Sequence, residues 1–125
     1  MKLHRSVTIA VFLAVLALSL AACLPIIPMC ESTINTVGNY KNGCGLSVSG
    51  GADSARLDMQ VQLKQGTLEW TLTDPQGVVR WQGTAEAGES VDLSRTFDNP
   101  APGRWDLTFQ LEQAAGEYHA QWTVQ

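Results

Sequence analysis

The chain has 125 residues, of which 45% are hydrophobic, 16% charged and 7% aromatic, and its formal net charge is −4. This length is enough for one domain. Without Lys2 and Arg5, which lie in an apolar N-terminal segment, six basic residues oppose twelve acidic ones, a balance of 6 − 12 = −6. This acidic balance argues against nucleic acid and anionic lipid head groups as partners.

The N-terminal segment has the layout of a secretory signal peptide. A short basic start, residues 1–5, precedes an uninterrupted run of apolar and small residues from Val7 to Leu20. A helix of this run would reach about 21 Å at ~1.5 Å per residue, which is short of a ~30 Å hydrocarbon core. A membrane span would need the following residues as well, and Pro25 and Pro28 oppose a helix there.

The apolar run ends in Leu20-Ala21-Ala22-Cys23, which resembles the lipobox of bacterial lipoproteins at all four positions. The resemblance implies that a diacylglycerol is attached to the Cys23 sulfur and that residues 1–22 are removed as a signal peptide. Two or three acyl chains, at about 0.8 kcal/mol per buried CH₂, hold a small domain on a bilayer. In enterobacteria, a residue other than aspartate after the lipidated cysteine, here Leu24, implies the outer membrane.

The expected location is therefore the extracytoplasmic face of a membrane, the outer membrane or cell surface, with covalent lipid at Cys23 as the membrane contact. Two alternatives stay open. The segment could be an ordinary cleavable signal peptide with an accidental cysteine, or an uncleaved N-terminal membrane helix.

The two remaining cysteines, Cys30 and Cys44, form a candidate disulfide. Assigning Cys23 to lipid leaves this pair in an oxidising compartment, 44 − 30 = 14 positions apart. The chain-entropy model gives about 3 kcal/mol for a loop of this size. A metal site would need further His or Cys ligands nearby, and the sequence has none there. Because glycines and prolines oppose long strands in this region, we expect a lipidated tether with a disulfide-stapled loop at 23–43.

Apolar and polar residues alternate from Gly45 onward, which is typical of antiparallel strands with one buried face. The expected strands and turns follow in chain order: strands at 46–48, 55–64, 68–72, 79–81, 91–97, 105–112 and 118–124, and turns at 65–66, 74–77, 98–103 and 114–116. Six or seven strands of this kind close only as two packed sheets or a small barrel. We expect an all-β domain at 44–125, an antiparallel β-sandwich of jelly-roll or immunoglobulin-like form.

Three stretches of this domain carry a family resemblance. GTLEWTLTDPQG, FDNPAPGRWDLTFQL and GEYHAQWTV resemble the jelly-roll or immunoglobulin-like modules attached to bacterial secreted proteins, including pre-peptidase C-terminal domains. The resemblance covers residues 66–124. It implies an accessory domain and transfers no functional residue.

Candidate catalytic residues are few. His119 is the only histidine after the signal segment, and the alternation of its strand places it toward solvent. A Ser-His-Asp set could be drawn from Ser90 or Ser94 with Asp92 and His119, but no nucleophile-elbow sequence accompanies them. The sequence therefore predicts that the protein is not an enzyme.

Oxygen ligands for calcium are also sparse. Asp74, Asp98 and Asn99 lie in expected turns, and no calcium-ligand repeat accompanies them. Turn formation explains these three residues more simply. We expect no cofactor and no metal.

Four tryptophans invite a carbohydrate-binding hypothesis because exposed indole faces stack on sugar rings. Trp70, Trp81, Trp105 and Trp122 all fall in the inward register, however, so we expect them in the core.

Two functional classes remain. The first is a non-enzymatic protein-interaction or structural module, an accessory subunit of a membrane complex that presents an acidic surface or an open strand edge. The second is a carbohydrate-binding or inhibitory module that uses the loops at 83–90 and 98–103.

Overall fold

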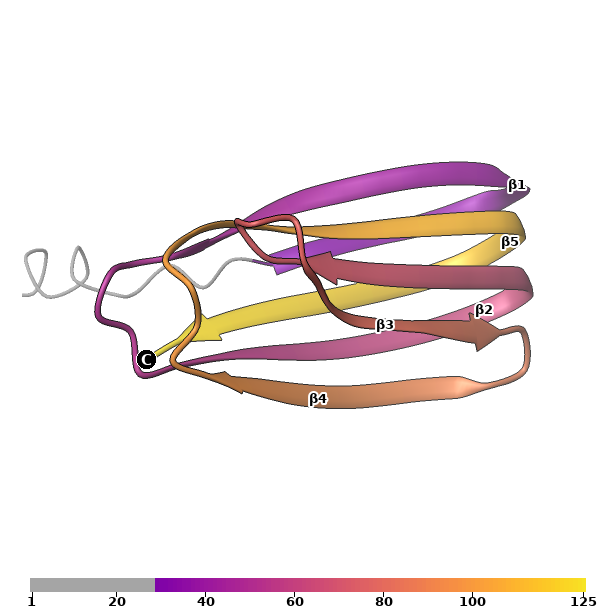
Figure 1. Ribbon diagram of the computed structural model, residues 1–125. Coiled ribbons are helices and arrows are strands. Elements are labelled where there is room, and N and C mark those ends of the chain that lie inside the picture. The colour runs from indigo at the N-terminus through magenta and orange to yellow at the C-terminus, as the bar shows by residue number, and fades with distance from the viewer. Residues whose placement is uncertain (1–28) are drawn as a thin grey trace, which may run out of the picture.

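The computed structural model describes residues 29–125, which form five antiparallel strands (Figure 1). The strands are β1 (Met29–Val48), β2 (Ser54–Thr73), β3 (Val79–Glu86), β4 (Ser90–Asp98) and β5 (Gly103–Val124). Residues 29–125 contain no helix, and hence no helix of the length and hydropathy that crossing a membrane requires. The predicted signal peptide and Cys23 lie outside the described residues.

Three of the strands bend and contribute to both layers of a sandwich. β5 lies between β1 and β2 along its length, whereas β2 pairs with β4 through its first half and with β3 through its second half. Layer A therefore has the order β1-β5-β2-β4, and layer B the order β1-β5-β2-β3. Layer A is built from residues 29–34, 116–124, 54–63 and 90–98, and layer B from 38–48, 103–115, 65–73 and 79–86.

This architecture is a jelly roll, two four-stranded antiparallel sheets made by folding long strands over. The bends of β1, β2 and β5 gather at one end of the molecule, as Figure 1 shows. The expected all-β antiparallel sandwich is confirmed.

Two expected turns are wrong, because the chain does not reverse at 65–66 or at 114–116. β2 and β5 continue through these residues from one layer into the other, with register shifts between Leu63 and Thr67. Gly66 and Gly116 have φ angles of +77° and +146°, a region open to glycine because it has no Cβ. Glycine here permits a sharp bend, and for this reason the chain has five long strands instead of six or seven short ones.

The expectation of a tether and stapled loop at 23–43 is also wrong for residues 29–43, the part of that range that the structure describes. These residues form most of β1, which pairs with β5 on both sides of a bend at Gly38. β1 is the outermost strand of both layers, so it has one strand partner and tolerates turn-forming residues and register shifts. The sandwich therefore begins at Met29 within the described residues, ahead of the expected boundary at 44.

Alternation predicted the core well on the central strands. Residues buried between the layers include these members of the inward register: Ala55, Leu57, Met59, Val61, Leu63, Leu68, Trp70, Leu72, Phe97, Trp105, Leu107, Phe109, Leu111, Tyr118, Ala120 and Trp122. The outermost strands depart from the pattern. Leu93 is 39% exposed, and Trp81 and Val91 are only partly buried, because β3 and β4 each have a strand neighbour on one side only. Val79 is 50% exposed because a register shift places it opposite Thr73, on the outer face of layer B. Val124, the last residue of β5, is also only partly buried.

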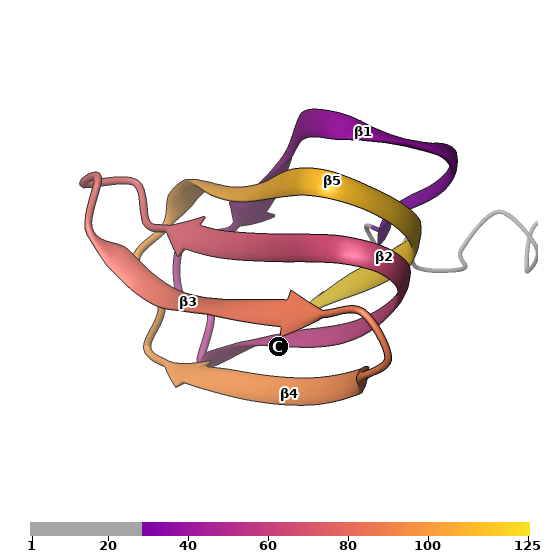
Figure 2. The same ribbon diagram turned by 90° about the vertical axis from the view of Figure 1, so that its right-hand side faces the viewer.

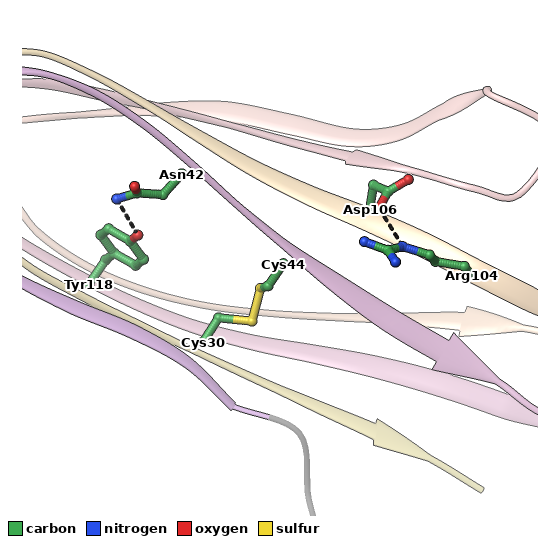
Figure 3. Close-up of a disulfide and its surroundings, with 6 residues drawn as sticks. All are labelled: Cys30, Asn42, Cys44, Arg104, Asp106 and Tyr118. Carbon is green, nitrogen blue, oxygen red and sulfur yellow. Dashed lines mark hydrogen bonds and ion pairs between the residues drawn. A yellow bond between two sulfur atoms is a disulfide. The ribbon is translucent and has the colours of Figure 1, made fainter.

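The predicted disulfide between Cys30 and Cys44 is present and joins the two layers (Figure 3). Cys30 lies opposite Ala120 in layer A and Cys44 lies opposite Leu107 in layer B, with 6.5 Å between the two Cα atoms. The bond thus closes the β1 side of the sandwich. Nearby, the Asn42 Nδ2 group donates a hydrogen bond of 3.0 Å to the Tyr118 hydroxyl.

Candidate binding groove

The residues considered for a catalytic triad lie on one surface but are not in contact. Register places His119 opposite Gln60, and Gln60 opposite Asp92, all on the outer face of layer A. The imidazole Nδ1 of His119 instead lies 3.1 Å from Oε2 of Glu31. A β-strand thus separates the histidine from Asp92, so the expected set is not assembled as a triad.

The same face carries two rows of polar side chains that cross all four strands of layer A. The first row is Glu31, His119, Gln60 and Asp92, and the second is Thr33, Glu117, Gln62 and Ser90. These residues line a groove of about 740 Å³. The rows form because alternate residues of a strand share a face and because the register aligns them across neighbouring strands.

The chemistry of the groove is that of hydrogen-bond donors and acceptors. Glu31, Asp92 and Glu117 supply carboxylates, and the two glutamines supply amides that both donate and accept. The Gln62 Nε2 group donates to Ser90 Oγ over 3.4 Å. Aromatic rings capable of stacking on a sugar are not prominent here, because the indole rings are packed inside the sandwich or at its β3–β4 side.

The groove continues toward the end of the molecule where the strands bend. A second hollow of about 400 Å³ shares Thr33, Gln62, Ser90 and Glu117 with the first and reaches Gly88 and Glu89. The 83–90 segment that we expected to carry ligand contacts thus contributes its last residues to the groove. Residues 98–103 do not line either hollow.

The expected turn role of Asp74 is confirmed. This buried carboxylate accepts hydrogen bonds from the backbone N–H groups of Gln76 and Val78 through Oδ1, over 2.9 and 3.0 Å. Its Oδ2 lies 3.5 Å from the Arg80 guanidinium. Within residues 29–125, no three His, Cys, Asp or Glu side chains gather as a potential metal-ion site.

No family model matches the chain, and no curated protein matches it. Solved structures do resemble it. A chain in the structure of Broad Bean Stain Virus is similar to this chain. The two are 11% identical over 81% of this chain and 86% of that chain, with a TM-score of 0.55. TmCBM61, solved with β-1,4-galactotriose, has 15% identity over 76% of this chain and 68% of that chain, with a TM-score of 0.49.

A third similar structure is much longer than this chain. The enzymatically active domain of bacteriophage CBA120 tailspike protein 4 has 11% identity and a TM-score of 0.49 over 82% of this chain, which spans only 18% of that chain. The Broad Bean Stain Virus structure, the one of these three with a TM-score above 0.5, shows the fold alone at 11% identity. The lipobox and the resemblance to pre-peptidase C-terminal domains stay predictions.

Proposed function

We propose that this chain is a lipid-anchored, non-enzymatic binding module on the extracytoplasmic face of a bacterial membrane, and that the layer A groove binds a hydroxyl-rich ligand of the carbohydrate class. The observation that carries the proposal is the pair of aligned polar rows across four strands. A rigid sheet holds such side chains in fixed positions, which lowers the entropic cost of ordering them around a ligand.

The composition of the rows favours sugars over other ligands. Each sugar hydroxyl both donates and accepts a hydrogen bond, and the groove offers carboxylates, amides, hydroxyls and an imidazole at neighbouring positions. A purely cationic ligand would use the carboxylates but would offer no acceptor to the amide donor of Gln60. Because stacking surfaces are scarce in the groove, hydrogen bonds would provide most of the affinity, and we expect weak binding.

The anchor would keep this groove close to the membrane. Cys23 precedes Met29 by 29 − 23 = 6 residues, and six residues span at most about 21 Å when extended. Met29 begins β1, and Glu31 in the first polar row follows two residues later. A ligand in the groove would therefore be a membrane-proximal glycan, in keeping with an envelope protein.

Calorimetric titration with cellotriose, β-1,4-galactotriose and a trimer of N-acetylglucosamine tests the groove. We expect saturable binding of at least one of them, and we expect Gln60→Ala at the centre of the first row to weaken it by at least about tenfold. Gln82→Ala is the matched control, because Gln82 is exposed on the outer face of layer B. Failure of all three sugars to bind, or equal effects of the two variants, would contradict the carbohydrate assignment; spermine binding in their place would reveal a cation site.

Metabolic labelling tests the anchor separately. A bacterial host that expresses the full chain with a clickable palmitate analogue should label the wild type and not Cys23→Ala. The Cys23→Ala chain should also appear in the soluble extracytoplasmic fraction or retain its leader, since no acyl chain can be attached to it. Wild-type protein without label would refute the lipoprotein assignment while leaving the groove untouched.

A further inference from the structure

The two sides of the sandwich are closed in different ways. On the β1 side, the disulfide between Cys30 and Cys44 joins the layers covalently. On the opposite side, β3 and β4 are the outermost strands of layers B and A, and each pairs only with β2 (Figure 2). Among the described strands, β3 and β4 therefore each have an edge with no strand partner. The predicted lipid tether joins the chain at β1, which leaves the β3–β4 side away from the attachment point.

Apolar side chains are exposed on this β3–β4 side. Leu93 is 39% exposed, although the alternation of β4 directs it inward. Trp81 is partly buried and packs edge-on against Trp70, with 5.8 Å between ring centroids. We call the surface of Trp81, Leu93 and Arg95 the open flank.

Arg95 occupies an inward position of β4, where it lies opposite the buried Leu57 of β2. Its Cζ atom lies 5.9 Å from the centroid of Trp81 in layer B and 5.7 Å from that of Phe97 in its own strand. These cation–π contacts bridge the layers and hold the guanidinium at the edge of the sandwich. These contacts favour a side-chain orientation that keeps the guanidinium at the β3–β4 side before any partner binds.

The charge of Arg95 is not neutralised by a neighbour within the described chain. Arg56, Arg80 and Arg104 each have an aspartate within 4.0 Å, whereas no carboxylate in residues 29–125 lies that close to Arg95. A guanidinium offers several N–H donors in a fork that matches a carboxylate. The open flank thus combines apolar surface with a cationic group that lacks a counterion, in a protein whose overall charge is negative.

The edge of β4 is also the most regular of the free edges. β4 pairs with β2 over nine residues without a register shift, from Ser54–Asp98 to Gln62–Ser90. β3 has a shift beside Val79, and β1 has two around Gly38. Because bulges disrupt strand pairing and regular edges support it, β4 is the edge that best accepts another strand.

We infer that the free edge of β4 binds an extended segment of a partner protein as an added strand, with a carboxylate beside Arg95 and apolar side chains beside Leu93 and Phe97. Backbone hydrogen bonds would supply affinity, and the alternate side chains would supply specificity. The required sequence pattern in the partner is apolar-x-acidic-x-apolar. Because this pattern is symmetric, it fits a strand added in either direction. This site uses the backbone edge and the inward side chains of β4, whereas the carbohydrate groove uses the outer face of layer A and reaches β4 at Ser90 and Asp92.

An inward arginine on an edge strand also discourages pairing with the wrong strands. An added strand with an apolar residue beside Arg95 would bury the charge without a partner, which costs free energy. A strand with a carboxylate at that position avoids this cost. Arg95 would therefore select the acidic segment by rejecting the others.

Fluorescence polarisation with a labelled peptide, Thr-Val-Thr-Glu-Thr-Val-Thr, tests the inference on the full chain in detergent micelles. We expect saturable binding that is weakened at least about tenfold by Arg95→Gln, and by a similar factor when the peptide glutamate is replaced by glutamine. Combining the two changes should add little, because both remove the same contact. Hydrogen exchange should slow at the β4 amides when the peptide is bound.

Two control variants separate this site from other surfaces. Arg104→Gln removes an exposed arginine on the outer face of layer B, and Gln60→Ala alters the groove; neither should change peptide affinity. Absence of saturable binding, or equal binding by the Arg95→Gln chain, would overturn the inference whether or not the groove binds sugar. A peptide-free dimer that Arg95→Gln dissociates would also overturn it, because the occupant would then be a second copy of this chain.

Discussion

Replacement of Trp105 by alanine should lower the free energy of unfolding by about 3 to 5 kcal/mol, the range for removing a fully buried aromatic side chain. Trp105 is 0% exposed and packs against Phe97 and Trp122, with centroid distances of 5.4 and 5.6 Å. Its Nε1 group also donates a hydrogen bond of 2.8 Å to the backbone oxygen of Ala101. Alanine would leave a cavity between the layers and an unpaired carbonyl in the β4–β5 corner.

Urea unfolding followed by circular dichroism measures this effect. Trp81→Ala is the matched control, since it makes the same change at a partly buried position on the open flank. We expect it to cost about half as much, because less apolar surface is removed from contact. Equal losses for the two variants would contradict the described difference in burial.

Gly66→Ala should lower the free energy of unfolding by about 3 kcal/mol or more. Alanine would be strained in the left-handed backbone conformation of this residue, and its Cβ atom would overlap atoms of the neighbouring strand. Gly66 has a φ angle of +77° at the bend of β2. A Cβ atom there would overlap the backbone carbonyl oxygens of Glu112 and Gln113 in β5. Because these are backbone atoms of the central strand, relief would require β2 and β5 to separate at the bend.

Gly88→Ala provides the control for backbone conformation alone. Gly88 has a φ angle of +85°, close to that of Gly66, but a Cβ atom there would meet nothing within 4 Å. Alanine at this position should lower the free energy of unfolding by about 1 to 2 kcal/mol, because it adds backbone strain at positive φ but no steric overlap. Thermal unfolding measures the loss of stability in both variants. Similar losses would show that the close approach of β2 and β5 is not what requires glycine at the bend.

Local patterns in the sequence predicted what depends on side-chain period. The alternation from Ala55 to Leu63 and from Trp105 to Leu111 identified the buried residues of β2 and β5, because alternate residues of a strand face the same side. The pairing of Cys30 with Cys44 followed from counting cysteines. The bends at Gly66 and Gly116 were predicted as turns, since a glycine with positive φ serves both a reversal and a bend.

The candidate sites could not be predicted to the same extent. His119, Gln60 and Asp92 belong to three strands, and only the register places them in one row across layer A. The sequence did mark His119 as exposed, and it suggested an open strand edge as a binding surface. It gave no sign that Arg95 would lie against Trp81, because that contact joins opposite layers.

The amino-acid sequence by itself determined the all-β class, most of the core, the cysteine pair and the expectation of a lipidated Cys23, because each depends on composition, alternation or a short motif. The tertiary structure decided how β1, β2 and β5 divide between two layers, and therefore which polar residues share the groove and which strand edges stay open. The reason is physical: strand pairing joins residues far apart in the chain, and no local pattern encodes which strand lies beside which.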